Sequence, residues 1–306
     1  MTLQFPVAPM KAAIGLLPPA GEDDRWAYEI KWDGYRTIAF VDNVAGTVRV
    51  QSSSGRDVTS TYPELAGLGS GVNAQRAVID GEIVVFGDDG LPTFEGLQRH
   101  QVQVVFQAFD ILSVDDRDVI GLPYEARRTL LADVVEAGSN WSVPGHRIGG
   151  GQELLAATFE QGLEGVMAKK LGSTYTPGRR SPSWRKVKNR RPMDVVIGGY
   201  TAGAGARSTT FGALLVGTPR PDGSLAFAGG VGTGFTQRRL EALLGLLRDH
   251  ATTECPFDPE PPRSYARDAT WVSPVLRAQI EVTELTNEGY VRHASFVGLN
   301  GHDLAG

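Results

Sequence analysis

Residues 26–41 (WAYEIKWDGYRTIAFV) alternate between apolar and polar side chains, with an interruption at Asp33-Gly34. Alternation with a period of two indicates a half-buried β-strand, and an Asp-Gly pair is typical of a turn. We therefore expect two strands around this turn. Lysine is rarely buried, because desolvating an ammonium group is unfavourable. Lys31, in the middle of the pattern, is thus either a surface residue of a strand or a nucleophile.

The remaining N-terminal residues predict many strands and a few helices. Strands are expected at 47–59, 76–87, 102–112, 164–170 and 183–189. A short helix is expected at 62–68, and longer helices that end at a glycine are expected at 124–138 and 152–165.

The character of the sequence changes near Arg190-Arg191-Pro192. The residues that follow form short apolar segments with Gly/Pro turns and one helical segment, 237–251, which is typical of a small β-barrel of the OB type. We expect an α+β domain of antiparallel sheets with helices over residues 1–192 and an OB-fold domain over residues 193–306. The glycine-rich segment 229–235 lacks the lysine of a phosphate-binding loop, so it is interpreted as a hairpin exit before a helix capped by Thr236.

Charge is unevenly distributed along the chain, whose formal net charge is −5. No acidic residue occurs between Gly165 and Met193. The basic residues in this stretch are Lys169, Lys170, Arg179, Arg180, Arg185, Lys186, Lys188, Arg190 and Arg191. Because apolar residues are interleaved with them, the stretch is expected to be folded and to offer a surface to a polyphosphate or a phosphodiester backbone.

Cysteine usage and hydropathy predict the compartment. The single cysteine, Cys255, excludes a disulfide framework and a cysteine-rich zinc site, and it suits a reducing compartment. No apolar run approaches the roughly 20 residues that span a bilayer. The N-terminal residues MTLQFPVAPM lack the basic start and apolar stretch of a signal peptide. We expect a cytosolic, monomeric protein that does not contact a membrane.

Six motifs follow one another in order. They are KWDGYR with Lys31 and Arg36, SSSGRDV with Arg56, DGEIV with Glu82, FQAFDIL with Phe109, EGVMAKK with Glu164 and Lys169, and WRKVKN with Lys186 and Lys188. This ordered set resembles the nucleotidyltransferase motifs of ATP-dependent DNA ligases, whose fold is shared with RNA ligases and mRNA capping enzymes. The chain looks most similar to the ligase domain of bacterial ligase D, the end-joining ligase, and the ligase C type is a near neighbour.

The resemblance implies an activity and its partners. Lys31 would form a lysyl-AMP with ATP, pass AMP to the 5′-phosphate at a nick, and allow the 3′-hydroxyl to close the strand. Mg²⁺ or Mn²⁺ is implied as a cofactor, and nicked or broken duplex DNA as the substrate in double-strand break repair. Ku and attached polymerase and nuclease domains are implied partners, so the chain is either a stand-alone ligase or an excised domain. An RNA ligase or capping enzyme, and a catalytically weak DNA-binding clamp, remain as alternatives.

The charged motif residues suit this chemistry. An ordinary lysine, with a pKa of roughly 10.4, is rarely the neutral amine that attack requires, but an apolar pocket and nearby cations favour the neutral form. Lys186 and Lys188 lie two apart and therefore on one strand face, where they would stabilise phosphoryl charge. The resemblance implies ribose contact or metal coordination for Glu82 and metal coordination for Glu164. Mg²⁺ suits such a pair, because it binds one or two carboxylates with phosphate oxygens and water.

The remaining motif residues are expected to bind the nucleotide. The resemblance implies that Glu29 and the backbone of Ile30 read adenine and that Phe109 stacks on it, with Phe106 as an alternative ring and core packing as the competing interpretation. Arg36 would bind a ribose or phosphate oxygen. Arg56 would bind AMP or DNA phosphates or be a surface arginine. Asp80 is expected to point to the other face, away from the site, if the strand is regular.

The last family motif departs from the pattern in this chain. In the sequence VRHASFVGLNGHDLAG (291–306), the matching residues are Arg292, Ser295, Phe296, Gly298 and Leu299. Asn300 stands at an arginine position, and His302-Asp303 replace an Asp-Lys pair. Because the family uses this motif to orient pyrophosphate, either self-adenylation is slower here or other basic residues such as Arg292 substitute.

Overall fold

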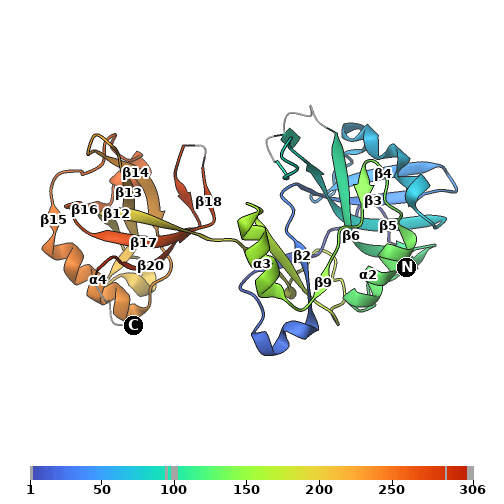
Figure 1. The fold of residues 1–306 in the computed structure, drawn as a ribbon, viewed down its shortest axis with the longest axis horizontal. Coiled ribbons are helices and arrows are strands. Elements are labelled where there is room, and N and C mark those ends of the chain that lie inside the picture. The colour runs from blue at the N-terminus through green and yellow to red at the C-terminus, as the bar shows by residue number, and fades with distance from the viewer. Residues whose placement is uncertain (1–2, 94–95, 98–102, 287, 302–306) are drawn as a thin grey trace. The chain divides into compact units, whose positions relative to one another are not determined.

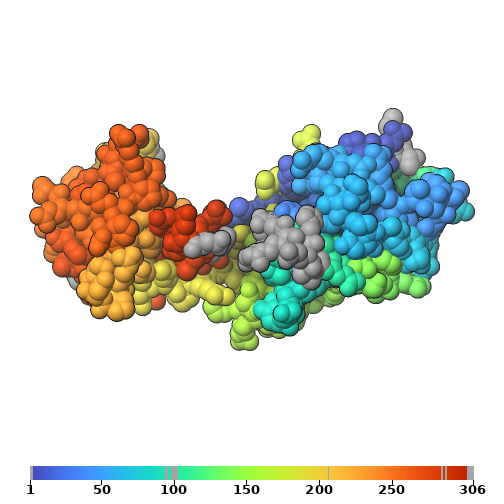
Figure 2. Space-filling model, turned by 90° about the horizontal axis from the view of Figure 1, so that it is seen from above, coloured from blue at the N-terminus to red at the C-terminus, as the bar shows by residue number. Residues whose placement is uncertain are grey.

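The computed structural model describes residues 3–93, 96–97, 103–286 and 288–301. The chain divides into two compact units, Met1–Asn189 and Arg190–Gly306. Residues from blue to yellow-green belong to the first unit and those from yellow to red to the second (Figure 2). The boundary that the sequence suggested, residue 192, falls in the first strand of the second unit, β12 (Arg191–Ala202).

Two sheets form the first unit. The first sheet has the order β1 (Lys11–Ile14), β11 (Arg180–Lys188), β10 (Gly165–Lys170), β2 (Trp26–Ile30) and β9 (Arg147–Ile148). The second has the order β4 (Thr47–Ser52), β3 (Tyr35–Asp42), β5 (Arg76–Val85), β6 (Val104–Val114) and β7 (Arg117–Asp118), with β8 (Trp141–Ser142) on β6. The described strand pairs are antiparallel except β1 with β11 and β6 with β8.

Helices pack against both sheets. Helix α2 (Tyr124–Val134) contacts β6, and α3 (Gly151–Glu160) contacts β10 and β2 (Figure 1). The 3₁₀ segments are η1 (Ala20–Arg25), η2 (Thr59–Thr61) and η3 (Pro63–Gly71). Both predicted long helices end earlier than expected. After α2, Val135 takes an extended conformation and pairs with Val72, which terminates the helix before Gly138.

The two predicted strands around Asp33-Gly34 exist, but they belong to different sheets. Strand β2 lies in the first sheet and β3 in the second, so residues 31–34 cross between sheets instead of closing a hairpin. Buried side chains from β1, β2, β3, β6 and β11 join the sheets in one core, which includes Ala12, Ala27, Ile38, Leu112 and Trp184. The crossing therefore lies at the junction of the two sheets.

We expect Gly34 to be required for this crossing. A Cβ atom added at Gly34 would lie 2.2 Å from the carbonyl oxygen of Ile83, and a backbone atom cannot move aside cheaply. Gly34→Ala should lower the free energy of unfolding by about 1–3 kcal/mol. Gly21→Ala is the control, because an added Cβ there meets no atom within 4 Å. Urea unfolding of the three proteins measures the effect, and equal stability of Gly34→Ala and wild type would contradict it.

The described residues of the second unit form a seven-stranded antiparallel sheet, a separate two-stranded sheet of β18 (Glu284–Leu285) with β19 (Val291–Arg292), and one long helix. Strand β12 pairs with β13 (Phe211–Pro219) along one edge and with both β16 (Ala269–Val272) and β17 (Arg277–Val282) along the other. The other strands of the larger sheet are β14 (Leu225–Val231), β15 (Ala251–Thr252) and β20 (Ser295–Leu299), and α5 (Arg263–Ala266) and η4 (Gly205–Arg207) are short.

Helix α4 (Gln237–Asp249) completes the core of the second unit. Leu240, Leu243, Leu244 and Leu247 are buried at helical spacing. The side chain of Thr236 accepts a hydrogen bond from the Arg239 backbone N–H at 3.2 Å, which confirms the predicted cap. None of the described helices is long and apolar enough to cross a membrane.

Candidate active site

A pocket opens where the two sheets of the first unit meet. Lys31 follows β2 directly, and its backbone N–H donates to the carbonyl of Gly165 at 2.9 Å, which keeps it beside β10. The lining comes from β2, β3, β5, β6, β10, β11 and the crossing segment. The lining residues are Glu29, Ile30, Lys31, Trp32, Arg36, Glu82, Phe109, Met167, Lys169, Trp184 and Lys186.

Lys31 is held in this pocket by Glu164. The Lys31 ammonium donates to Oε2 of Glu164, and Nζ of Lys188 lies 2.8 Å from Oε1 of the same carboxylate. The Lys31 side chain is 13% exposed. Although burial opposes ionisation of Glu164, Lys31 and Lys188 outweigh it and hold the pKa of this carboxyl below its usual value. Glu164 is therefore an ionised residue that positions the Lys31 amine.

Lys186 places a further cation at the pocket. It lies on β11 opposite Met167 of β10 and lines the pocket together with Lys31. Burial and then repulsion from Lys31 lower the pKa of Lys186. Two cations this close are unfavourable in an empty pocket and become favourable around a polyphosphate.

Glu82 on β5 is a further carboxylate that lines the pocket. Burial raises its pKa to about 7, although the charges of Arg36 and Lys31 act in the opposite direction. Among the residues that the structure describes, no group of three or more His, Cys, Asp or Glu side chains is arranged to hold a metal ion. A divalent cation would thus need phosphate oxygens or water in addition to Glu82 and Glu164.

The pH dependence of stability should report the Glu82 carboxyl group. Its pKa in the folded protein lies above the ordinary value of 4.5, so its ionisation destabilises the folded state as the pH rises from 4.5 to about 7. Across this window the free energy of unfolding of wild type should fall by about 1–3 kcal/mol relative to that of Glu82→Gln. Denaturant unfolding of both proteins in metal-free buffer at several pH values measures this. A difference that does not change with pH would refute the raised pKa.

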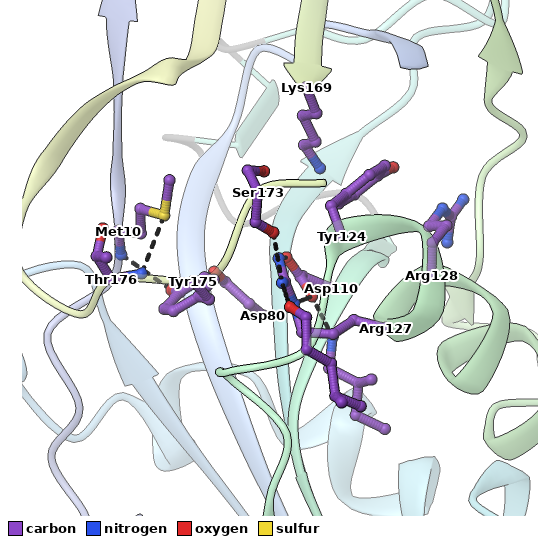
Figure 3. A network of polar contacts seen from close by, with 12 residues as sticks. Met10, Asp80, Asp110, Tyr124, Arg127, Arg128, Lys169, Ser173, Tyr175 and Thr176 are labelled. Carbon is purple, nitrogen blue, oxygen red and sulfur yellow. Dashed lines mark hydrogen bonds and ion pairs between the residues drawn. The ribbon is translucent and has the colours of Figure 1, made fainter. Parts of the chain in front are cut away.

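Arg36 is fixed at the pocket by Asp80. Its Nε and Nη2 atoms each lie 2.6 Å from an oxygen of Asp80. Tyr175, which Figure 3 shows beside Asp80, donates its hydroxyl to Oδ2 of Asp80 at 2.6 Å. The expectation that Asp80 faces away from the site is wrong. Asp80 and Glu82 are two residues apart in β5, and such residues share a strand face. The guanidinium carbon of Arg36 also lies 4.5 Å from the centroid of the Phe109 ring.

The structure distinguishes the two candidate aromatic rings. Phe109 lines the pocket, whereas Phe106 is fully buried in the core of the second sheet and fills the space beside Gly81. Trp32, Met167 and Trp184 also line the pocket, and sequence reasoning assigned no role to them. Trp184 could have been found, because it precedes Lys186 by two residues on the same strand face.

Glu29 is buried at the inner side of the pocket. It is 3% exposed, so it is not a solvated strand residue. Nζ of Lys169 lies 2.7 Å from its Oε2, and the Tyr124 hydroxyl donates to its Oε1. Nε of Arg128 lies 3.8 Å from the same Oε1. Tyr124 and Arg128 come from α2, which no motif marked as part of the site.

The remaining predicted residues lie partly at the pocket and partly elsewhere. Ile30 lines the pocket, but Arg56 is exposed in the loop after β4, where its Nε lies 3.3 Å from Oγ of Ser54. In the second unit, Phe296 and Leu299 are buried, and Phe296 stacks on Phe235 with ring centroids 4.9 Å apart. Nδ2 of Asn300 lies 3.2 Å from Oδ1 of Asp194. His302 and Asp303 fall outside the described residues.

Both units match known family models. Residues 19–188 match the model described as ATP dependent DNA ligase domain. Residues 207–301 match the model described as ATP dependent DNA ligase C terminal region.

Two groups of curated relatives are similar to this chain in sequence. One group matches nearly all of the chain, and the other matches most of it. The multifunctional non-homologous end joining protein LigD of Mycobacterium bovis is 43% identical over 296 residues, which are 96% of this chain and 38% of that protein. DNA ligase C of Mycobacterium tuberculosis is 34% identical over 277 residues, which are 84% of this chain and 73% of that protein. The chain thus spans less than two fifths of the length of this LigD relative.

Two solved structures match nearly the whole chain. The ligase domain of Mycobacterium tuberculosis LigD is 41% identical, with a TM-score of 0.58 over 96% of this chain and 95% of that one. A mycobacterial DNA ligase D complexed with ATP and MES is 40% identical, with a TM-score of 0.57 over the same shares.

Proposed function

Because the chain belongs to the family of ATP-dependent DNA ligases, we propose that it seals nicks or ends in duplex DNA through a lysyl-AMP formed on Lys31. The position of Lys31 carries the proposal. Its amine lies in a pocket with an aromatic ring, Phe109, and a second cation, Lys186, and Glu164 holds it in place. This combination suits an adenine nucleotide whose α-phosphate faces the amine.

Three displacements at phosphorus make up the reaction. Lys31 gives a proton to water, its Nζ attacks the α-phosphorus of ATP, and pyrophosphate leaves. A 5′-phosphate oxygen of the DNA then attacks the same phosphorus and releases the Lys31 amine. Finally, the 3′-hydroxyl gives its proton to water and attacks the 5′-phosphorus, AMP leaves and the strand is closed. Lys186 and Lys188 stabilise the charge on the transferring phosphoryl group, and Glu164 orients Nζ.

The other pocket residues hold the nucleotide. Phe109 stacks on the adenine, and Glu29 with the Ile30 backbone reads its edge. Both oxygens of Asp80 hold Arg36 in place. The other N–H groups of the Arg36 guanidinium donate to ribose or phosphate oxygens. Glu82 contacts the ribose. Arg56 is exposed and contacts DNA phosphates.

A divalent cation, Mg²⁺ or Mn²⁺, is the proposed cofactor besides ATP. Glu82 and Glu164 would hold it together with phosphate oxygens and water, because Glu82 lines the pocket and Glu164 contacts the pocket lysine Lys31. Such an ion would neutralise phosphate charge and orient the leaving group.

We place this activity in double-strand break repair by end joining in the bacterial cytosol, at the nucleoid. The relatives named for non-homologous end joining support this role. Ku and attached polymerase and nuclease domains are the proposed partners. The family models favour a DNA ligase over an RNA ligase, a capping enzyme or a clamp without catalysis.

Transfer of a labelled nucleotide tests the proposal. The protein is incubated with α-labelled ATP or GTP and Mg²⁺ or Mn²⁺, and the covalent label is then chased with nicked DNA or nicked RNA. We expect label from ATP, followed by its transfer to the 5′ end of DNA. Label from GTP alone would indicate a capping enzyme, transfer to RNA alone an RNA ligase, and no label a clamp.

A further inference from the structure

The hydroxyl of Tyr175 links the N-terminal segment of the chain to the Asp80 carboxylate. Its oxygen accepts the backbone N–H of Met10 at 2.9 Å, and the hydroxyl donates to Oδ2 of Asp80 at 2.6 Å. Figure 3 shows Tyr175 between Met10 and Asp80. Tyr175 is 2% exposed and Asp80 is fully buried, so bulk water does not compete for these groups.

The chemistry of the groups fixes the direction of these hydrogen bonds. A hydroxyl has a single proton to donate, and a backbone N–H can only donate. Because the Met10 N–H occupies an acceptor site of the Tyr175 oxygen, the hydroxyl proton points to Asp80. Burial and then the charge of Asp80 raise the pKa of Tyr175 well above its usual value, so the hydroxyl keeps this proton near neutral pH.

Oδ2 of Asp80 joins Tyr175 to the pocket residue Arg36. The same oxygen accepts from Nη2 of Arg36 at 2.6 Å, and Oδ1 accepts from Nε at 2.6 Å. Nη2 also donates to the carbonyl of Met10 at 3.4 Å. These contacts hold the edge of the guanidinium that carries Nε and Nη2. They do not involve Nη1, which is left for a ligand in the pocket that Arg36 lines.

The ring and the backbone around Tyr175 are held independently of its hydroxyl. The backbone N–H of Thr176 donates to Sδ of Met10 at 3.2 Å. The Tyr175 ring packs edge-on against Trp184, with ring centroids 5.8 Å apart. A phenylalanine at position 175 would keep both contacts, so the effect of the hydroxyl can be measured alone.

We propose that Tyr175 is a positioning residue for the nucleotide: its hydroxyl holds the Asp80 carboxylate, and thereby the Arg36 guanidinium, in the orientation that binds a nucleotide oxygen. The proposal rests on the proposed function, in which Arg36 contacts ribose or phosphate. Tyr175 is not one of the described residues that line the pocket, so it acts through Asp80 and Arg36. A donor that is already oriented binds its ligand without the cost of being ordered at that moment.

The test measures lysyl-AMP formation in single turnovers over a range of ATP concentrations. Tyr175→Phe should raise the ATP concentration that gives the half-maximal rate by about three- to tenfold, the usual effect of one lost hydrogen bond. The maximal rate should change less, because Arg36 contacts the nucleotide both before and during transfer.

Tyr28→Phe is the matched control. Tyr28 is also fully buried in the first unit, and its hydroxyl donates to Oδ1 of Asp23 at 2.6 Å. Neither residue is among those that line the pocket. Tyr28→Phe should therefore leave the ATP dependence unchanged, and urea unfolding measures the stability of both variants. Equal shifts of the ATP dependence in the two variants would show a general loss of stability and would overturn the inference.

A second arm tests whether Tyr175 acts through Arg36. Arg36→Lys keeps a cation but lacks the fork that pairs with both oxygens of Asp80. Adding Tyr175→Phe to Arg36→Lys should therefore change the ATP dependence much less than adding it to wild type. The same factor in both backgrounds would show that Tyr175 acts independently of Arg36, which would contradict the proposal.

If Tyr175→Phe does not fold, Asp80→Asn replaces it, because it keeps the size of the side chain and removes the charge that joins Tyr175 to Arg36. An unchanged half-maximal ATP concentration in the variant that folds would overturn the inference. No label from ATP on wild type would instead overturn the proposed function.

Discussion

Lys31→Ala is expected to abolish covalent attachment of AMP while the protein remains folded. Lys31 is the lysine that both lines the pocket and contacts Glu164, and in the variant Lys188 still pairs with that carboxylate. The loss should therefore be catalytic and not structural. Intact-mass measurement after incubation with ATP and Mg²⁺ detects the adenylate, and thermal unfolding monitors the fold.

Lys170→Ala is the matched control for this substitution. Lys170 is exposed at the end of β10, so its removal should leave adenylation unchanged. An adenylate that persists on Lys31→Ala and maps to another lysine would show that Lys31 is not the nucleophile.

Lys186→Ala should slow self-adenylation by roughly 10²–10³, the usual effect of removing one preorganised group that stabilises transition-state charge. Binding to nicked DNA should weaken far less, because Lys186 lies inside the pocket and is more than half buried from solvent. Glu164→Ala should act in the same direction, since it releases both Lys31 and Lys188. Single-turnover lysyl-AMP formation and nick binding are measured on the same preparations.

Lys11→Ala is the control for Lys186→Ala. Lys11 is an exposed lysine on β1, the strand that pairs with β11, and its loss should leave the adenylation rate intact. If Lys186→Ala reduced adenylation and DNA binding by equal factors, Lys186 would be a general phosphate contact instead of a catalytic residue.

Local patterns predicted the elements of this protein well. The alternation in residues 26–41, the helical periodicity of residues 237–251 and the Thr236 cap all correspond to elements of the structure. The match to the LigD ligase domain and the two family models confirm the predicted fold of a nucleotidyltransferase domain followed by an OB domain. The strand alternation, the helical periodicity and the cap each depend on residues a few positions apart, so they can be predicted directly from the sequence.

The pairing of the strands could not be predicted from local sequence patterns. The Asp33-Gly34 segment resembles a hairpin turn in sequence, yet it connects two sheets, because the partners of β2 and β3 come from distant parts of the chain. Similarly, Phe106 and Phe109 are equally apolar in context, and the strand alone did not select the ring that faces the pocket.

By itself, the sequence determined the motif residues Lys31, Glu82, Glu164 and Lys186, and with them the expected chemistry. Only the tertiary structure decided what surrounds them. Glu29 meets Tyr124 across 95 positions and Lys169 across 140 positions of the chain. Such contacts arise because buried charges must find opposite charges or donors wherever folding brings them together, and no short-range pattern encodes that choice.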